Sequence, residues 1–231
     1  LPLPDGRIRE IPGGPATYIG GALRRLGFAC RMITGEHVLV DVLRGDHGEE
    51  YVIPAIPKIA LPPTFDTEAV ILSPIIREID PDAVPEVKGM LVLDLQGFVR
   101  QPGRSSAEAA GEYELGSLLR RASVVKASPN ELERLTEASR QAMPSTCLLV
   151  ITHGVEGLTV RFDGGEQFLP ALPIRAPYTI GAGDTLLAGI VTGLLQKRPP
   201  LEAVERSMRF TEVVLKERRA AQVTVETAHV E

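Results

Sequence analysis

The segment from Gly181 to Asp184 reads Gly-Ala-Gly-Asp and stands immediately before an apolar run, a pattern that suits phosphate chemistry. Two glycines let a turn bring backbone N–H groups close to a ligand, and the helix predicted to follow adds the positive end of its dipole. An acid beside an anion site would repel the anion, so Asp184 calls for a specific explanation, and one is a base acting on a hydroxyl that attacks a phosphate. The alternative interpretation is an ordinary helix N-terminus with an Asp in its first turn.

A capping box opens a second predicted helix at Ser128, with Pro129 at the first helical position and Glu131 three residues after the cap. In that helix Asn130 and Glu133 are three residues apart and therefore share a face. These two side chains are either oxygen ligands for a metal ion or part of a solvated helix surface.

Further polar residues stand where predicted strands end and loops begin. In a mostly parallel α/β sheet, ligands bind beyond the carboxyl ends of the strands, so these residues are expected to share one rim. Each also has a simpler explanation, since Thr152 and Gly154 could form a turn and Asp94 could cap a loop. The residues concerned are Asp94, Lys126, Thr152 and Gly154, together with the loop at Gly181.

Short apolar runs alternate with helical patterns between residues 69 and 215, which predicts a mostly parallel sheet covered by helices on both faces, an α/β fold. Helices are expected at residues 108–121, 186–195 and about 201–219. Buried strands are expected at residues 69–73, 91–95, 123–126 and 147–151, and a strand at 158–162 is expected to pair with the last of these.

The N-terminal third has a less regular pattern. Gly13 and Gly14 open a predicted helix that Gly27 ends, and residues 28–34 are expected to form a strand. Residues 35–63 hold short strand-like pieces, at 38–43 and 51–56, that are broken by Gly and Pro. Residues 1–12 are rich in proline and are expected to be extended.

The composition is that of an ordinary globular protein of 231 residues, with 44% hydrophobic and 24% charged residues, so one domain over residues 1–231 is expected. A net charge of −5 gives no electrostatic footprint for nucleic acid or for an anionic membrane. No apolar run approaches the roughly 20 residues of a membrane-spanning helix, and a cytoplasmic location is expected. Cys30 and Cys147 are expected to be buried free thiols, and the four His show no metal-ligand spacing.

The motifs and their order along the chain resemble those of the ribokinase-like (PfkB-type) family of ATP-dependent sugar and nucleoside kinases, over about residues 13–216. The resemblance implies a three-layer α-β-α fold with a mostly parallel central sheet and a reduced or partly missing lid. The stretch from Leu93 to Arg100, together with Tyr18, looks most like the inositol kinase-like branch. The motifs that carry the resemblance are the Gly-Ala-Gly-Asp segment, the pair Asn130 and Glu133, residues 151–154 with Gly157, and Gly13 and Gly14 with a helix closing at residues 25–27.

The resemblance implies that Asp184 takes the proton from an acceptor hydroxyl as that hydroxyl attacks the γ-phosphate of ATP. The amides of Gly181, Ala182 and Gly183 would stabilise charge on the transferring phosphoryl group. Mg²⁺ would be held through water by Asn130 and Glu133, because this ion gives up its hydration shell reluctantly. The implied nucleotide residues are Lys126, Thr152, Gly154 and Gly157, and the implied substrate residues are Gly13, Gly14, Tyr18, Asp94, Gln96 and Arg100.

The sequence also departs from the family pattern. Tyr18 stands where many members carry an Asn that contacts the sugar. Tyr178 stands where many carry an Asp associated with a monovalent cation site, so activation by potassium is not predicted. The substrate-binding Asp that normally precedes the glycine pair has only Asp5 as a counterpart. Residues 35–68 are shorter than the usual lid region, whose sheet extensions often form dimer contacts in this family.

Together these features predict a kinase that uses ATP and Mg²⁺ to phosphorylate a hydroxyl of a small sugar or polyol, inositol-like by the branch resemblance. The expected partner is this small molecule, with neither nucleic acid nor a membrane, and a homodimer is compatible with the family. The alternatives are a nucleoside kinase of the same family and a non-catalytic nucleotide-binding module.

Overall fold

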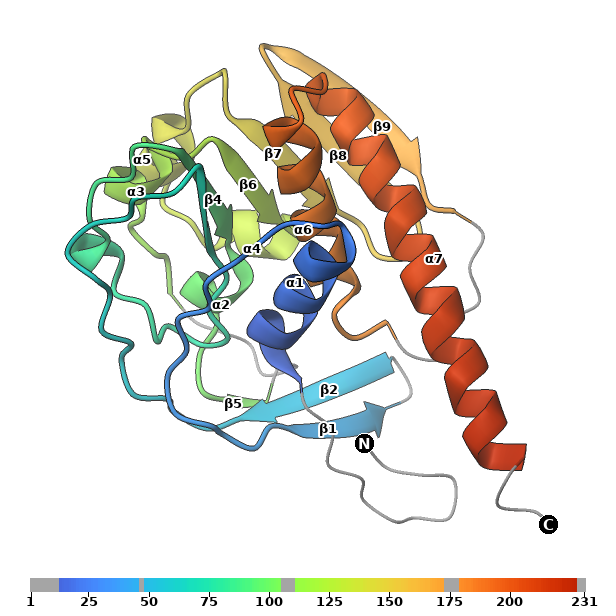
Figure 1. Cartoon of the computed structure of the whole chain (residues 1–231). Helices are drawn as coiled ribbons and strands as arrows, with labels where there is room; N and C mark the ends of the chain where they lie inside the picture. The colour runs from blue at the N-terminus through green and yellow to red at the C-terminus, as the bar shows by residue number, and fades with distance from the viewer. Residues whose placement is uncertain (1–12, 46–47, 105–110, 173–178, 228–231) are drawn as a thin grey trace.

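The computed structural model describes residues 13–45, 48–104, 111–172 and 179–227. Adjacent strands from β3 to β7 of the central sheet run parallel, whereas β8 and β9 are antiparallel and form one edge (Figure 1). The mostly parallel α/β sheet expected from the sequence is confirmed. Its six strands lie in the order β3 (Ala69–Leu72), β4 (Met90–Asp94), β6 (Val124–Ala127), β7 (Leu148–Thr152), β8 (Gly157–Phe162) and β9 (Gly165–Pro170).

Successive apolar side chains of the central strands face two different helical layers. Leu91 and Leu93 of β4 belong to a core shared with α2 (Gln96–Val99) and α3 (Gly116–Leu119). Val92, between them, belongs to the opposite core, which contains residues of α6 (Ala182–Leu195) and α7 (Pro200–Thr227). Each such side chain contributes about 1.5–3 kcal/mol when it is fully buried. The three-layer arrangement follows from covering both faces, and it holds the strand ends rigidly.

Shorter elements complete the two layers. The helix α1 (Gly14–Arg25) packs on α6, where Ile19 and Leu23 form a small core with Ala188. The other layer also contains α4, α5 and the 3₁₀ turn η1, with the bounds Pro129–Glu133, Glu137–Ala142 and Pro81–Ala83. No described helix combines the length and the apolar character that crossing a membrane requires.

A separate three-stranded sheet is made of β1 (Asp41–Gly45), β2 (Gly48–Ile53) and β5 (Gly103–Arg104), and its neighbouring strands are antiparallel (Figure 1). Its first two strands fall within the region expected to be a shortened lid. The strand predicted at 51–56 ends at Ile53, because the next residue is a proline and has no N–H for a ladder.

Two predicted elements are wrong. Residues 28–34 form no strand, and Met32 and Ile33 are 40% and 37% exposed. An apolar, β-prone segment needs a neighbouring strand, and none pairs with these residues in the described part of the chain. Within the described part of the helix predicted at 108–121, residues 111–121, α3 is the one helical segment, because Tyr113 instead pairs with Leu135 in an isolated parallel bridge. That contact depends on a residue 22 positions away and leaves no pattern in the local sequence.

Smaller differences concern the ends of elements. The last helix is longer than predicted, β9 was not predicted, and Cys30 is half-buried whereas Cys147 is buried. Residues 1–12 and Tyr178, on which several predictions rested, lie outside the described residues.

Candidate active site

The loop that leads into α6 at Gly181, called the anion loop below, has the backbone geometry of an anion site. Gly181 is the N-cap of α6 and has a φ of 76°, in the left-handed region that favours glycine. The N–H groups of the first helical turn have no carbonyl within the helix to bond, and they point toward its N-terminal end. Ala182 differs, since its N–H donates to the carbonyl of Thr179 at 2.9 Å. Among the predicted anion-binding amides, that of Gly183 is therefore better suited to bind an anion than that of Ala182. The amide of Asp184, in the same helical turn, is suited to bind an anion as well.

The ring of Tyr18 packs directly against this loop. A β-carbon built on Gly181 would lie only 2.3 Å from Cγ of Tyr18. The guanidinium carbon of Arg218 lies 4.8 Å from the centroid of the same ring, a cation–π contact. Nη1 of Arg218 also donates to the carbonyl of Ile180 at 3.0 Å. Tyr18, predicted as a substrate residue, thus supports the anion loop, and Arg218 holds the loop from the last helix.

Asp184 lies in the first turn of α6, half-buried and next to a second carboxylate. The hydroxyl of Ser73 lies 3.5 Å from Oδ1 of Asp184 and 3.2 Å from Oδ2 of Asp94. Burial, and then the negative charge of Asp94, raise the pKa of Asp184 to about 6. A carboxylate with this pKa is ionised at neutral pH and is more basic than an ordinary Asp, as a general base requires.

Lys126 brings a buried positive charge to the same place. Its Nζ lies 2.8 Å from Oδ2 of Asp94, and both side chains are buried. Burial lowers the pKa of Lys126, but the charge and hydrogen bond of Asp94 raise it, and the net direction is upward. A β-carbon on Gly183 would lie 3.0 Å from this ammonium. The charged Lys126 therefore sits against the first turn of α6, where a bound phosphoryl group would benefit from it.

Gln96 and Arg100, the two substrate residues predicted after β4, lie at the start and the end of α2. The N–H of Gln96 donates to Oδ1 of Asp94 at 3.3 Å, which fixes the start of α2. Arg100, the C-cap of α2, is placed over the ring of Tyr51 in β2, with its guanidinium carbon 5.9 Å from the ring centroid. Burial lowers the pKa of Arg100. Arg100 thus connects the rim of the central sheet to the small sheet.

The predicted metal residues lie on α4, whose capping box is confirmed. The N–H of Ser128 donates to Oε2 of Glu131 at 2.7 Å, and the N–H of Glu131 donates back to the Ser128 hydroxyl at 3.3 Å. Asn130 and Glu133 are both exposed, with side-chain oxygens of the kind that Mg²⁺ prefers. The described residues hold no group of three or more His, Cys, Asp or Glu that could bind a metal. This donor set fits an ion bound largely through water and donor phosphates.

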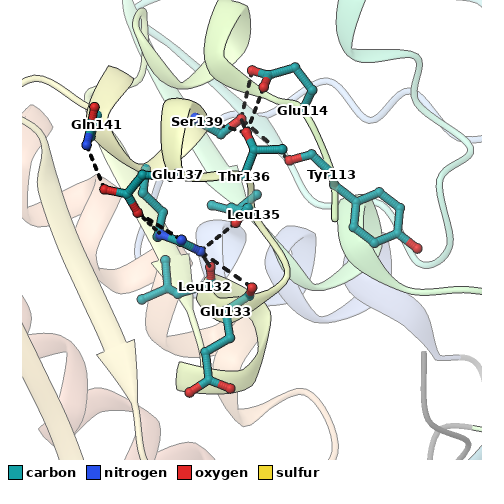
Figure 2. Close-up of polar contacts among 10 residues, drawn as sticks. Tyr113, Glu114, Leu132, Glu133, Leu135, Thr136, Glu137, Ser139 and Gln141 are labelled. Atoms are coloured by element: carbon teal, nitrogen blue, oxygen red, sulfur yellow. Dashed lines mark hydrogen bonds and ion pairs between the residues drawn. The ribbon is translucent and has the colours of Figure 1, made fainter. Parts of the chain in front are cut away.

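A polar cluster fixes the C-terminal end of α4 (Figure 2). Nη1 of Arg140 donates to the carbonyls of Leu132 and Glu133 at 3.2 and 3.4 Å and also to that of Leu135. The carboxylate of Glu137 pairs with Arg140 at 2.9 Å and keeps the guanidinium in place. Figure 2 shows the carboxylate of Glu133 pointing away from this cluster. The cluster therefore holds the backbone of α4 and leaves that carboxylate available.

Three of the four predicted nucleotide residues, Thr152, Gly154 and Gly157, lie where the chain turns between β7 and β8. The hydroxyl of Thr152 donates to the carbonyl of Ala127 at 3.4 Å, and Gly154 has a φ of 61° at the exposed tip. A β-carbon on Gly157 would lie 2.2 Å from the carbonyl oxygen of Leu169. Packing against β9 therefore explains why Gly157 is a glycine, without any contact to a nucleotide.

The glycine pair at the start of α1 borders a cleft of about 640 Å³. Gly13 is the N-cap of α1, and its carbonyl accepts the hydroxyl of Thr17 at 2.7 Å. The cleft runs between α1, the extended residues 28–38 and the residues around β3, and Ser73 lies in its wall. An acceptor in this cleft would lie beside the hydroxyl that contacts Asp184.

Two residues of the site were missed at the sequence level. Ser73 is the last residue of the predicted strand 69–73, and its polar side chain at the end of a buried strand was a usable signal. Arg218 had none, because it reaches Tyr18 and Ile180 from a helix far along the chain.

A mostly parallel sheet between helical layers, with a glycine loop and a half-buried acid at its rim, is the arrangement of a ribokinase-like α/β fold. A model described as pfkB family carbohydrate kinase matches residues 105–228, over half of the 231 residues, and the chain belongs to this family. The predicted family is confirmed.

The comparisons also give similar individual proteins. An inositol 3-kinase of Zea mays is 32% identical over 109 residues, which are 46% of this chain and 28% of the maize protein. A sulfate complex of a pyrophosphate-dependent kinase in the ribokinase family superposes with a TM-score of 0.59 at 22% identity, over 74% of this chain and 66% of the other. A pyrophosphate-dependent myo-inositol-1 kinase converted into a myo-inositol-3 kinase gives 0.52 at 25% identity, over 65% and 58%. The matches thus span less than two thirds of each relative.

Proposed function

We propose that this chain transfers a phosphoryl group to a hydroxyl of a small polyol of the inositol type, with Asp184 as the general base. The observation that carries the proposal is the position of Asp184, half-buried in the first turn of α6 directly after the left-handed Gly181, with a pKa raised to about 6. Membership of a carbohydrate kinase family and the similarity to an inositol 3-kinase support the acceptor class.

In the proposed reaction, Asp184 accepts the proton of the acceptor hydroxyl as its oxygen attacks the terminal phosphorus of the donor. The bond from that phosphorus to the leaving phosphate oxygen breaks, and the amides at Gly183 and Asp184 stabilise the charge on the transferring group. Lys126 adds its buried ammonium at the same helix end. Asn130 and Glu133 would hold Mg²⁺, which supplies positive charge to the donor phosphates when it is bound.

The acceptor is proposed to occupy the cleft bordered by Gly13 and Gly14, where a polyhydroxylated molecule can approach the backbone closely. Ser73 lies in the wall of this cleft and contacts Asp184, so an acceptor hydroxyl bound there can reach the base. Gln96 and Arg100 are proposed as further polar contacts from the start and end of α2.

The donor is proposed to be ATP, held at the turn of Thr152 and Gly154 and at Lys126. Pyrophosphate is the second candidate, because two similar structures are of pyrophosphate-dependent kinases and because packing alone accounts for Gly157. The two donors share the terminal phosphoryl group proposed to lie at the anion loop, and ATP additionally carries adenosine and one more phosphate.

The test is a phosphate-transfer assay with both donors against inositols, sugars and nucleosides, on the wild type, Asp184→Asn and the exposed control Asp82→Asn. We expect turnover with a polyol, a fall of about 10³-fold or more in Asp184→Asn with donor affinity kept, and no change in the control. Transfer only to nucleosides would replace the polyol with a nucleoside acceptor. Donor binding without transfer to any hydroxyl would leave the nucleotide-binding module as the function.

A cytoplasmic location, a homodimer and a single domain over the whole sequence stay predictions. Light scattering of the purified protein measures the dimer directly.

A further inference from the structure

Ser73 follows β3 at the carboxyl edge of the sheet and lies between the two carboxylates of the site. Its hydroxyl oxygen is 3.2 Å from Oδ2 of Asp94 and 3.5 Å from Oδ1 of Asp184. A serine hydroxyl has one proton and can donate to only one of these oxygens at a time. The position of that proton therefore decides which carboxylate is stabilised.

Asp94 already has other donors. Its Oδ2 accepts the ammonium of Lys126 at 2.8 Å, and its Oδ1 accepts the N–H of Gln96 at 3.3 Å. Asp94 is 1% exposed, so little of its surface remains for a substrate. The Ser73 oxygen is closer to Asp94 than to Asp184, but Asp94 already has a charged donor, so the Ser73 proton stabilises Asp184 more than it stabilises Asp94.

Ser73 also belongs to the wall of the 640 Å³ cleft that borders Gly13 and Gly14. Among the described residues of that wall, it is the one with a hydrogen bond to Asp184. The side chain is half-buried, with one side on the cleft and the other on the carboxylate network.

We propose that Ser73 is a positioning residue for the base: its hydroxyl donates to Asp184 and orients that carboxylate toward the cleft, while Lys126 and the N–H of Gln96 are the donors to Asp94. This inference rests on the proposed function of Asp184. It also gives Asp94 a different role from the one expected from the sequence, since Asp94 then acts on Asp184 through its charge and touches no substrate.

The groups that face Asp184 come from four other elements and act in opposite directions on its pKa. After burial, Asp94 at the end of β4 raises it, whereas Lys126 of β6, Ser73 after β3 and Arg218 of α7 lower it. Removing the Ser73 hydroxyl should therefore raise the pKa of Asp184, and removing the charge of Asp94 should lower it. A purely structural role of either residue would produce no such pair of opposite shifts.

The experiment compares Ser73→Ala, Ser73→Thr and Asp94→Asn with the wild type and with Ser117→Ala. The control removes another Ser–Asp hydrogen bond, the exposed one from Ser117 to Asp82. The first readout is the pH dependence of kcat/KM. The second is the ¹³C NMR titration of the Asp carboxyl carbons, with the Asp184 signal assigned from Asp184→Asn, and it needs no activity.

We expect Ser73→Ala to raise the Asp184 titration midpoint by about 0.5–1 pH unit and to lower kcat about ten-fold. Asp94→Asn should move the midpoint downward, while Ser73→Thr, which keeps the hydroxyl, and Ser117→Ala should leave it in place. An unchanged midpoint in Ser73→Ala, or shifts of the same sign in Ser73→Ala and Asp94→Asn, would overturn the inference. A wild type without phosphoryl transfer but with the expected NMR shifts would instead contradict the proposed function.

Discussion

The substitution Gly181→Ala tests the geometry of the anion loop most directly, because this position has no room for a β-carbon. An ideal Cβ on Gly181 would lie 2.3 Å from Cγ of Tyr18 and 2.5 Å from its two Cδ atoms. Gly181 also has a φ of 76°, which alanine adopts only with strain. Both effects act on the same residue, but only the first depends on the tyrosine ring.

The expected cost follows from these two contributions. The left-handed backbone costs about 1–2 kcal/mol for a residue with a β-carbon. Forcing a methyl group into the Tyr18 ring costs a further 1–3 kcal/mol or so, as overpacking does in a dense interior. We therefore expect Gly181→Ala to lower the free energy of unfolding by about 2–5 kcal/mol. The ring must also move away from Arg218, so turnover should fall as well.

The measurement is a double-mutant cycle by urea unfolding with the wild type, Gly181→Ala, Tyr18→Ala and the double variant. In the Tyr18→Ala background only the backbone contribution remains, and Gly181→Ala should then cost about 1–2 kcal/mol. The matched control is Gly21→Ala in α1, where a β-carbon meets nothing within 4 Å, and where alanine should be neutral or stabilising by about 0.5–1 kcal/mol. An equal cost of Gly181→Ala in both backgrounds would refute the packing of Tyr18 on the loop.

Three further predictions concern stability and the metal residues. Gly97→Ala should lower the free energy of unfolding by at least about 1–3 kcal/mol, because its β-carbon would lie 1.9 Å from the carbonyl oxygen of Pro74. Urea unfolding measures this loss, and a smaller loss would contradict the contact. Since the folded-state pKa of Asp184 is raised to about 6 from 3.8, ionisation is disfavoured in the fold, and the wild type loses stability as the pH rises between these values. Asp184→Asn should therefore raise Tm at pH 7.5 but not at pH 3, and an equal effect at both would count against the raised pKa. Arg140→Gln should remove the hydrogen bonds to the C-terminal carbonyls of α4 and so increase the Mg²⁺ concentration needed for half-maximal activity. A metal titration at fixed donor concentration measures this value. An unchanged value would show that the Arg140 cluster does not position Glu133 for the metal.

Some of the site follows from residues that are close together in the chain. The capping box at Ser128 was predicted correctly, because it depends on hydrogen bonds within four residues, whereas the helix expected from residue 186 starts four residues earlier, at Ala182. The buried strands β4, β6 and β7 were found from short apolar runs, since a strand covered on both faces has little choice of side chain. These features also carry the family resemblance.

Other features depend on contacts that the sequence does not display. The strand predicted at 28–34 has no partner strand in the described residues, and the helix predicted at 108–121 is interrupted where Tyr113 pairs with Leu135. Lys126 was predicted as a nucleotide residue, but its ammonium is bound to a carboxylate 32 residues earlier, in the neighbouring strand. Asp94 was predicted as a substrate residue and is almost completely buried.

The sequence by itself determined the α/β class, the anion loop with its acid, and the family to which the chain belongs, because these depend on local backbone preferences and on apolar periodicity. Only the tertiary structure decided that Ser73 contacts an Asp 111 residues further along the chain and that Tyr18 fills the space beside Gly181. The physical reason is that parallel strands bring their carboxyl ends to one rim, whatever the sequence distance between them. The environment that gives Asp184 its raised pKa is therefore assembled by the register of the sheet.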